Sequence, residues 1–303
     1  MVVLSMEGIG ILIVCTLLFF ILPSLYFAYK LAYPKISSLT PSPKSLGLEF
    51  YEKKISYDES GIDAWYFPAD SDFITVLIPG FGIDKTYLIK LIKPLHEAKI
   101  NLLVTDFQLQ SNINTKTLCT FGLNESAIIL NIIRWIKSQN NFKNKKISIV
   151  SFSIGASAAF IASTKNETID ALIMDSAIYD VKAILKVALQ RMFGMIGFLF
   201  FPITMYFFKL FIKHDPNEIN LMNYVSFSKA KKVLVIHSKK DTVSYWRLAE
   251  EFFKKILIKK EIWLTESDHT QTFFDLPSGY VSRVCAIIKD CENKGDVDEV
   301  IKK

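Results

Sequence analysis

The chain has 303 residues, and its 36 lysines and arginines against 30 aspartates and glutamates give a formal net charge of +6. Hydrophobic residues make up 50% of the sequence and the mean hydropathy is +0.27, which excludes disorder and fibrous repeats for most of the chain. The positive charge comes mainly from scattered lysines, so no nucleic-acid partner is expected. The four cysteines show no metal-ligand spacing, which predicts neither a metal site nor a disulfide framework.

Residues 1–30 are predicted to form a transmembrane anchor, because the 22 residues from Gly8 to Tyr29 carry no charge. As a helix this run would be about 33 Å long, enough to cross the hydrocarbon core of a bilayer. The alternative is a cleaved signal peptide, but no Lys or Arg precedes the run and no small-x-small cleavage site follows it. Three lysines follow the run within residues 30–44 whereas Glu7 precedes it, so the positive-inside rule predicts that the rest of the chain is cytoplasmic.

After a Pro- and Ser-rich linker, residues 31–46, short apolar runs alternate with amphipathic or small-residue stretches. This alternation is typical of an α/β fold with a mostly parallel sheet and helices on both faces. Eight strands are predicted: Leu48–Tyr57, Ile62–Phe67, Phe73–Ile78, Asn101–Phe107, Lys146–Phe152, Ile169–Asp175, Lys232–His237 and Glu261–Thr265. The predicted core covers residues 47–180 and 225–290, and residues 291–303 form a charged tail.

The stretch from Val181 to Tyr224 interrupts this alternation between the sixth and seventh predicted strands. Its centre, residues 192–208, is uncharged and rich in Phe and Met, and two glycines and a proline within it would break a long helix. We predict an inserted cap, formed by a helix pair with an exposed apolar face, on which Phe198 and Phe201 are expected to bind the substrate. A buried core element and a second membrane crossing are the alternatives.

The segment Ser151-Phe152-Ser153-Ile154-Gly155 joins a predicted strand to a helix of small residues. A serine on such a sharp turn projects out of the sheet, and the residues two before and two after it must be small. Ser151 and Gly155 meet this requirement, so Ser153 is a candidate nucleophile. A serine-rich turn that caps the helix is the alternative.

The order Ser153, Asp241, His269 along the chain supplies a nucleophile, a carboxylate and a base. Asp241 and His269 both follow predicted strands at their carboxyl ends, where open α/β sheets place their sites. Taken singly, Asp241 could be a helix cap and His269 an exposed loop residue. Asp175, at the end of the sixth predicted strand, is the second candidate for the acid.

Acyl transfer also needs backbone N–H groups that stabilise an oxyanion. One is expected from Ile154, directly after the candidate nucleophile. The other is expected from Phe81, in the turn Pro79-Gly80-Phe81-Gly82, where glycines let the backbone approach closely. A glycine turn without this role is the alternative.

These motifs, together with residues 170–176, resemble the α/β-hydrolase superfamily over residues 47–290, in particular membrane-tethered serine hydrolases similar to monoacylglycerol lipases and serine aminopeptidases. The resemblance implies a Ser153, His269, Asp241 triad, an oxyanion hole from Phe81 and Ile154, and a cap over the substrate pocket. The sequence departs from the family pattern at Pro79, where a histidine is usual, and at Ser151, where a glycine is usual.

These observations predict a membrane-anchored serine hydrolase that cleaves a carboxylic ester or thioester, with an acyl-chain substrate and no cofactor. The acyl preference follows from the anchor and the apolar cap. A peptidase or an acyltransferase would use the same triad. A catalytically silent fold that binds a lipid or a protein through the cap is the alternative from another class, and the oligomeric state is not determined by the sequence.

Overall fold

The computed structural model of the whole chain describes residues 5–39, 42–57, 61–106, 118–165 and 168–292. At its centre lies an eight-stranded sheet in the spatial order β1-β2-β4-β3-β5-β6-β7-β8. Strand β2 is antiparallel to both of its neighbours, and the other adjacent pairs are parallel. The strands are β1 (Tyr51–Ile55), β2 (Ile62–Phe67), β3 (Phe73–Ile78), β4 (Asn101–Thr105), β5 (Lys146–Phe152), β6 (Ile169–Asp175), β7 (Lys232–Ser238) and β8 (Lys259–Thr265).

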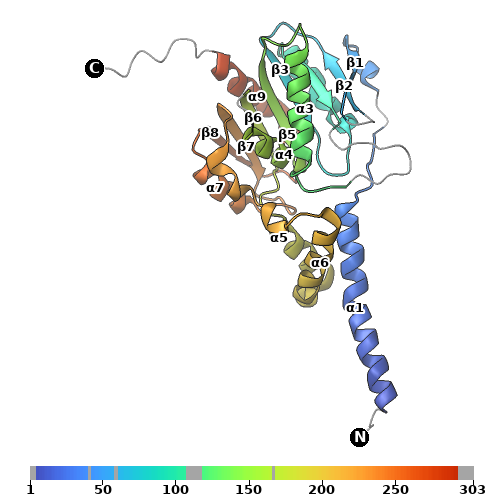
Figure 1. Cartoon of the computed structure of the whole chain (residues 1–303). Helices are drawn as coiled ribbons and strands as arrows, with labels where there is room; N and C mark the ends of the chain where they lie inside the picture. Colours follow the sequence, from blue (N-terminus) through green and yellow to red (C-terminus); the bar gives the residue numbers. More distant parts are fainter. Residues whose placement is uncertain (1–4, 40–41, 58–60, 107–117, 166–167, 293–303) are drawn as a thin grey trace.

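Helices cover both faces of this sheet and enclose two hydrophobic cores (Figure 1). One face carries α3 (Glu125–Ser138), α4 (Ile154–Ser163) and α7 (Trp246–Lys255). The other carries α2 (Ile89–Glu97), α8 (Thr272–Asp275) and α9 (Pro277–Glu292). Because both faces are covered, the central strands are mostly apolar, and every residue of β6 is buried.

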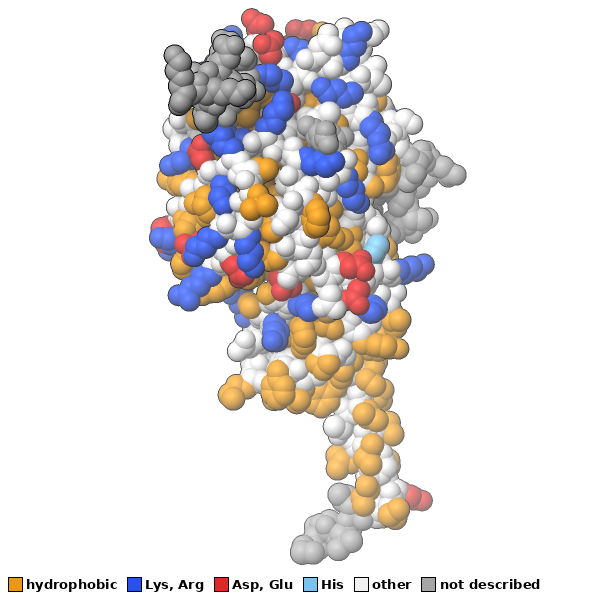
Figure 2. Space-filling model, turned by 60° about the vertical axis from the view of Figure 1, so that its left-hand side comes forward, with side chains coloured by type: hydrophobic (Ala, Val, Ile, Leu, Met, Phe, Trp, Pro, Cys, Tyr) orange, Lys and Arg blue, Asp and Glu red, His pale blue; other side chains and the backbone are white. Residues whose placement is uncertain are grey.

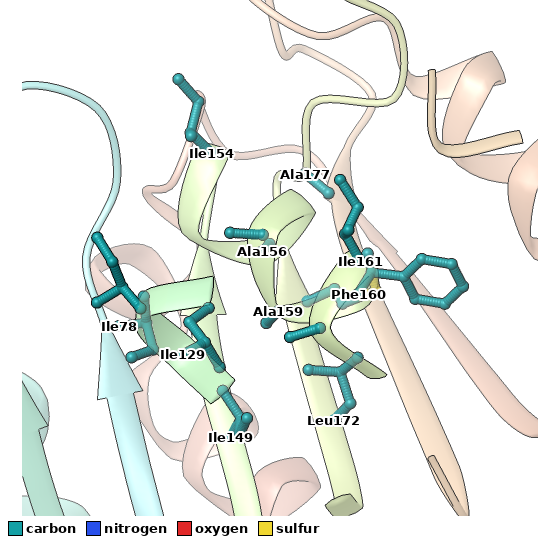
Figure 3. Close-up of a cluster of buried hydrophobic side chains, with 14 of the residues drawn as sticks. Ile78, Ile129, Ile149, Ile154, Ala156, Ala159, Phe160, Ile161, Leu172 and Ala177 are labelled. Atoms are coloured by element: carbon teal, nitrogen blue, oxygen red, sulfur yellow. The ribbon is translucent and has the colours of Figure 1, made fainter. Parts of the chain in front are cut away.

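Helix α4 packs closely against the sheet because its side chains are small. Ala156 and Ala159 face the strand residues Ile149 and Leu172 in a single buried cluster (Figure 3). All ten residues of α4 are buried, so a larger side chain on this helix would have to displace the sheet or α3. The close approach fixes the start of α4, and with it the turn that connects β5 to α4.

A long helix and a helical hairpin project from the body of the molecule. Helix α1 (Met6–Ala32) extends away from the sheet, and α5 (Val181–Phe193) and α6 (Gly197–Ile212) lie beside the half of it nearest the domain (Figure 1). Gly194, with a φ of +59°, turns the chain between α5 and α6. At Gly197 a Cβ atom would lie 2.5 Å from the Leu189 carbonyl oxygen, so the two helices meet only because this residue is glycine.

The structure confirms the predicted fold class, an eight-stranded and mostly parallel sheet between helices. Strands β2, β3, β5 and β6 have the predicted bounds, whereas β1 is shorter because residues 48–50 precede its pairing with β2. Residues 291 and 292 complete α9, and the rest of the predicted tail lies outside the described residues. The insert forms the expected helix pair, followed by short 3₁₀ turns up to β7.

Candidate active site

Ser153 lies on the turn between β5 and α4, with its backbone in a strained conformation. Its φ is +52°, a region that L-residues rarely adopt and that is typical of functional sites. A Cβ atom on Gly155 would lie 2.2 Å from the Pro79 carbonyl oxygen and 2.9 Å from a side-chain carbon of Ile78. Only glycine therefore fits two residues after Ser153, which agrees with the motif predicted from the sequence.

The serine that replaces the usual first glycine of this motif is accommodated inside the sheet. Ser151 is fully buried, and its hydroxyl donates a hydrogen bond of 2.9 Å to the Ile173 carbonyl oxygen of β6. The departure at this position therefore leaves no buried polar atom without a partner. It also links the two strands whose ends carry Ser153 and Asp175.

The structure brings Ser153, His269 and Asp241 together in one chain of hydrogen bonds. The Ser153 Oγ atom lies 3.0 Å from His269 Nε2, and His269 Nδ1 lies 2.6 Å from Asp241 Oδ2. The second Asp241 oxygen accepts hydrogen bonds from the backbone N–H groups of Val243 and Ser244, at 2.7 and 2.9 Å. This arrangement can draw a proton from the serine hydroxyl while the carboxylate holds the imidazole in place.

A second histidine, on β7, also faces Asp241. His237 is fully buried; its Nε2 atom lies 2.8 Å from the Ser244 carbonyl oxygen and 3.4 Å from Asp241 Oδ2. Burial lowers the pKa of His237, which favours a neutral ring that donates from Nε2. Burial alone would raise the pKa of Asp241, but its hydrogen bond to His269 and the two nearby histidines hold it below the usual value.

Asp175, the second candidate for the acid, supports the loop that carries the histidine. Its carboxylate accepts a hydrogen bond of 2.9 Å from the Ser176 hydroxyl, which in turn accepts one of 3.0 Å from the Thr270 backbone N–H. Complete burial raises the pKa of Asp175 to about 7, against the lowering effects of Ser176 and of the His269 charge. Ser176 and Thr270 both have positive φ, so the backbone is strained on both sides of this hydrogen bond.

The two expected oxyanion donors belong to segments that adjoin Ser153. Ile154 is the first residue of α4, where helix geometry leaves the N–H without an intrahelical acceptor. Phe81 belongs to the turn after β3, and a Cβ atom on the neighbouring Gly80 would lie 3.2 Å from Ser153 Cβ. The turn therefore packs directly against Ser153, although a proline stands at its first position.

The segment after α1 pairs with this same turn. Ser37 forms an isolated parallel bridge with Ile83; its N–H donates to the Gly82 carbonyl oxygen at 2.7 Å, and its carbonyl accepts from the Asp84 N–H at 3.3 Å. Gly82 has a φ of +67°, and a Cβ atom there would lie 3.3 Å from the Lys35 carbonyl oxygen. The predicted linker thus contacts the site, a non-local pairing that no sequence motif indicates.

The two predicted substrate-binding residues lie on α6. Phe198 is exposed near the start of that helix, and the Phe201 ring lies 5.8 Å from Lys186 Nζ of α5. Both residues therefore belong to the hairpin and not to the turn that carries Ser153. A row of aromatic rings joins the turn at residues 79–82, called the oxyanion turn after its proposed role, to α6. The centroid distances are 5.9 Å from Phe81 to Phe121 and 5.6 Å from Phe121 to Phe208.

The described residues contain no group of three or more His, Cys, Asp or Glu side chains that could hold a metal ion.

Solved structures with the same architecture include an esterase from Pyrococcus furiosus, with a TM-score of 0.70 and 22% identity over 86% of this chain and 97% of the esterase. A dienelactone hydrolase from Anabaena variabilis has a TM-score of 0.57 and 13% identity, covering 80% of this chain and 97% of its own. A membrane phospholipase A, described as a bacterial virulence factor, has a TM-score of 0.60 and 14% identity, covering 94% and 97%.

The chain therefore has the α/β-hydrolase fold, as its motifs imply. These similarities, at 22% identity and below, establish the fold alone. No family model matches the chain, and no curated protein matches it in sequence. The narrower likeness to monoacylglycerol lipases and serine aminopeptidases stays a prediction.

Proposed function

We propose that this protein is a membrane-anchored serine hydrolase that cleaves a carboxylic ester or thioester of an acyl lipid. The observation that carries the proposal is the position of His269, hydrogen-bonded on one side to the Ser153 hydroxyl and on the other to the Asp241 carboxylate. This geometry provides a general base for the nucleophile and an acid that fixes the tautomer of the base.

In the proposed reaction, His269 Nε2 takes the proton of Ser153 as Oγ attacks the carbonyl carbon of the substrate. The resulting oxyanion is stabilised by the N–H groups of Ile154 and Phe81. His269 then gives the proton to the leaving alcohol or thiol, and an acyl-serine remains. A water molecule deprotonated by the same imidazole attacks the acyl carbon, and release of the fatty acid restores Ser153.

A membrane anchor is supported by the packing of α1. This helix is long and apolar enough to span a membrane, a property that a signal sequence near the N-terminus would share. However, Ser24, Ala28 and Ala32 are completely buried, on a stretch of α1 that packs against α6, where Phe200 and Phe208 are buried as well. Cleavage of α1 would expose the face of α6 that it covers, which favours a helix that stays attached. The lysines after α1 favour a cytoplasmic domain.

The lipid substrate is supported by the surroundings of the site. The aromatic row from Phe81 to Phe208 leads from the oxyanion turn to the apolar hairpin. An apolar path of this kind suits an acyl chain that leaves the bilayer. Two of the structural neighbours are named an esterase and a membrane phospholipase A, and both names refer to ester hydrolysis.

The proposal is tested by labelling the full-length protein in detergent with a fluorophosphonate probe. Labelling is expected for the wild type and for Ser163→Ala, a control at the far end of α4, and is expected to vanish in Ser153→Ala and His269→Ala. A folded wild type that does not react, or a Ser153→Ala variant that still reacts, would contradict the proposal. A panel of esters, thioesters and amides of different chain lengths then identifies the scissile bond.

A further inference from the structure

The tip of the α5–α6 hairpin, residues 192–199, carries an unusual number of exposed apolar side chains. Met195 is 89% exposed and Phe198 is 68% exposed, and Met192, Ile196 and Leu199 are exposed as well. Figure 2 shows hydrophobic side chains gathered at the lower end of the molecule, beside the projecting helix and away from most of the charged side chains. A soluble surface rarely leaves such a patch uncovered, so the tip requires an apolar partner.

Next to the tip, the buried Phe200 packs the hairpin against α1. The Phe200 ring lies 4.9 Å from the ring of Phe20 and 5.9 Å from that of Phe19, and the Ser24 hydroxyl donates to the Phe200 carbonyl oxygen at 3.4 Å. Beyond these contacts most side chains of α1 are exposed and apolar, among them Leu12 and Leu17. Whatever covers the outer part of α1 also reaches the tip.

Contacts with α1 also set the depth of the tip. Phe20, which touches Phe200, lies ten residues before Lys30, the first charged residue after the apolar run. At 1.5 Å per residue this separation is about 15 Å, or half of the hydrocarbon thickness of a bilayer. When Lys30 lies at the headgroups, the tip lies near the middle of the membrane.

On both α1 and α6, apolar side chains give way to aromatic and charged ones at the same height above the tip. Phe211 of α6 lies 5.9 Å from Tyr29 and 6.0 Å from Tyr33, so the end of α6 lies beside the end of α1. Tyr26 and Tyr206 are both exposed just below this level, as expected for residues at a membrane interface. Charged side chains return on α6 at residue 209, beside the end of α1.

Arg191 is the one charged residue near the tip, two positions before the end of α5, and it is exposed. Its long side chain can extend back along α5 toward the headgroups while its methylene groups remain among apolar atoms. A basic residue in this position suits the phosphate of a lipid headgroup. It does not suit an apolar protein groove.

From these observations we infer that the hairpin tip inserts into the bilayer leaflet next to the domain, beside α1, and does not cross the membrane. The partner of the exposed patch is the acyl region of lipids. The protein then has two points of contact with the membrane, a spanning helix and a re-entrant hairpin, and together they fix the tilt of the catalytic domain. This inference rests on the anchor of the proposed function and is independent of the catalytic residues.

The test uses nitroxide labels on the full-length protein in vesicles of phosphatidylcholine and phosphatidylglycerol. Cys285→Ser and Cys291→Ser remove two thiols, and Cys119 is buried. In this background the native Cys15 reports on α1. With Cys15→Ser added, Met195→Cys reports on the tip, and Leu257→Cys on the exposed loop before β8. Collision with oxygen, which concentrates in lipid, is compared with collision with a water-soluble nickel chelate, and circular dichroism checks the fold.

The expected result is an oxygen-to-nickel collision ratio at positions 15 and 195 that is several-fold higher than at position 257. A label at position 195 that is as accessible to nickel as the label at position 257 would place the tip in water and overturn the inference. Low collision with both reagents at position 195, together with dipolar broadening, would mean that a second copy of the chain covers the tip and would also overturn it. Nickel access at position 15 would instead refute the anchor itself.

Discussion

Replacement of Asp241 by asparagine separates the role of the acid from the stability of the fold. The carboxylate accepts backbone N–H groups at Oδ1 and His269 Nδ1 at Oδ2. In Asp241→Asn the amide oxygen is expected to keep the backbone donors, because an NH₂ group cannot accept from them. The NH₂ group then faces His269 Nδ1 and forces this nitrogen to become the acceptor.

The proton of the imidazole then lies on Nε2, which must donate to Ser153 and can no longer take its proton. We expect the bimolecular rate constant for fluorophosphonate labelling to fall by about 10³–10⁴, equivalent to about 4–5.5 kcal/mol of activation free energy. The melting temperature should change little, since the substitution conserves shape and most hydrogen bonds. The rate is measured from the time course of labelling at several probe concentrations.

Two further substitutions of the same kind serve as controls. Asp268→Asn changes the exposed carboxylate next to His269 and should leave the rate unchanged. Asp175→Asn should lower the rate far less than Asp241→Asn, because Asp175 contacts the histidine loop through Ser176. A rate for Asp241→Asn within tenfold of the wild type would refute the assignment of the acid, and a larger loss in Asp175→Asn would transfer the role to Asp175.

Gly155→Ala should destabilise the fold by about 2 kcal/mol in urea titrations, because its Cβ would meet the Pro79 carbonyl oxygen at 2.2 Å. Gly279→Ala in α9, where the nearest atom is 3.6 Å away, should not; equal effects would contradict this reasoning. Asp175 has its pKa raised from 3.8 to about 7, so the folded protein binds its proton more tightly than the unfolded chain and stability falls as pH rises through this window. Between pH 4 and pH 8, the free energy of unfolding of Asp175→Asn should therefore rise by about 4 kcal/mol relative to that of the wild type. Parallel curves of unfolding free energy against pH for the two proteins would contradict this. Phe198→Asp should reduce hydrolysis of long-chain esters in vesicles by about tenfold and spare short soluble esters, since the tip contacts lipid; equal losses would argue against it.

Much of the fold could be predicted because its signals are local. Strands such as β5 and β6 are mostly apolar runs with clear ends, since both faces of the sheet are covered. The motif around Ser153 is also local, because the space around Gly155 restricts the residues that can stand beside the turn. Asp241 and His269 could be selected because each follows a strand at its carboxyl end.

What could not be predicted depends on contacts that no local pattern in the sequence indicates. His237 belongs to β7, and its approach to Asp241 depends on the path of the loop between them. Ser176 supports Thr270 across 94 residues of chain, and neither residue type signals such a role. The pairing of Ser37 with the turn after β3 depends on where α1 ends, and the packing of α1 on α6 helps to set that position.

The pairing of Ser37 with the turn at Gly82 and Ile83 has a practical and a mechanical consequence. A soluble version of the protein that starts at β1 would lose a covering segment of the oxyanion turn, so reduced turnover in such a truncated protein would say nothing about its need for lipid. In the intact protein, only four residues separate the end of α1 from Ser37. When the hydrocarbon thickness of the bilayer differs from the length of the apolar part of α1, the mismatch strains this short connection. The strain is then transmitted to the turn that packs against Ser153.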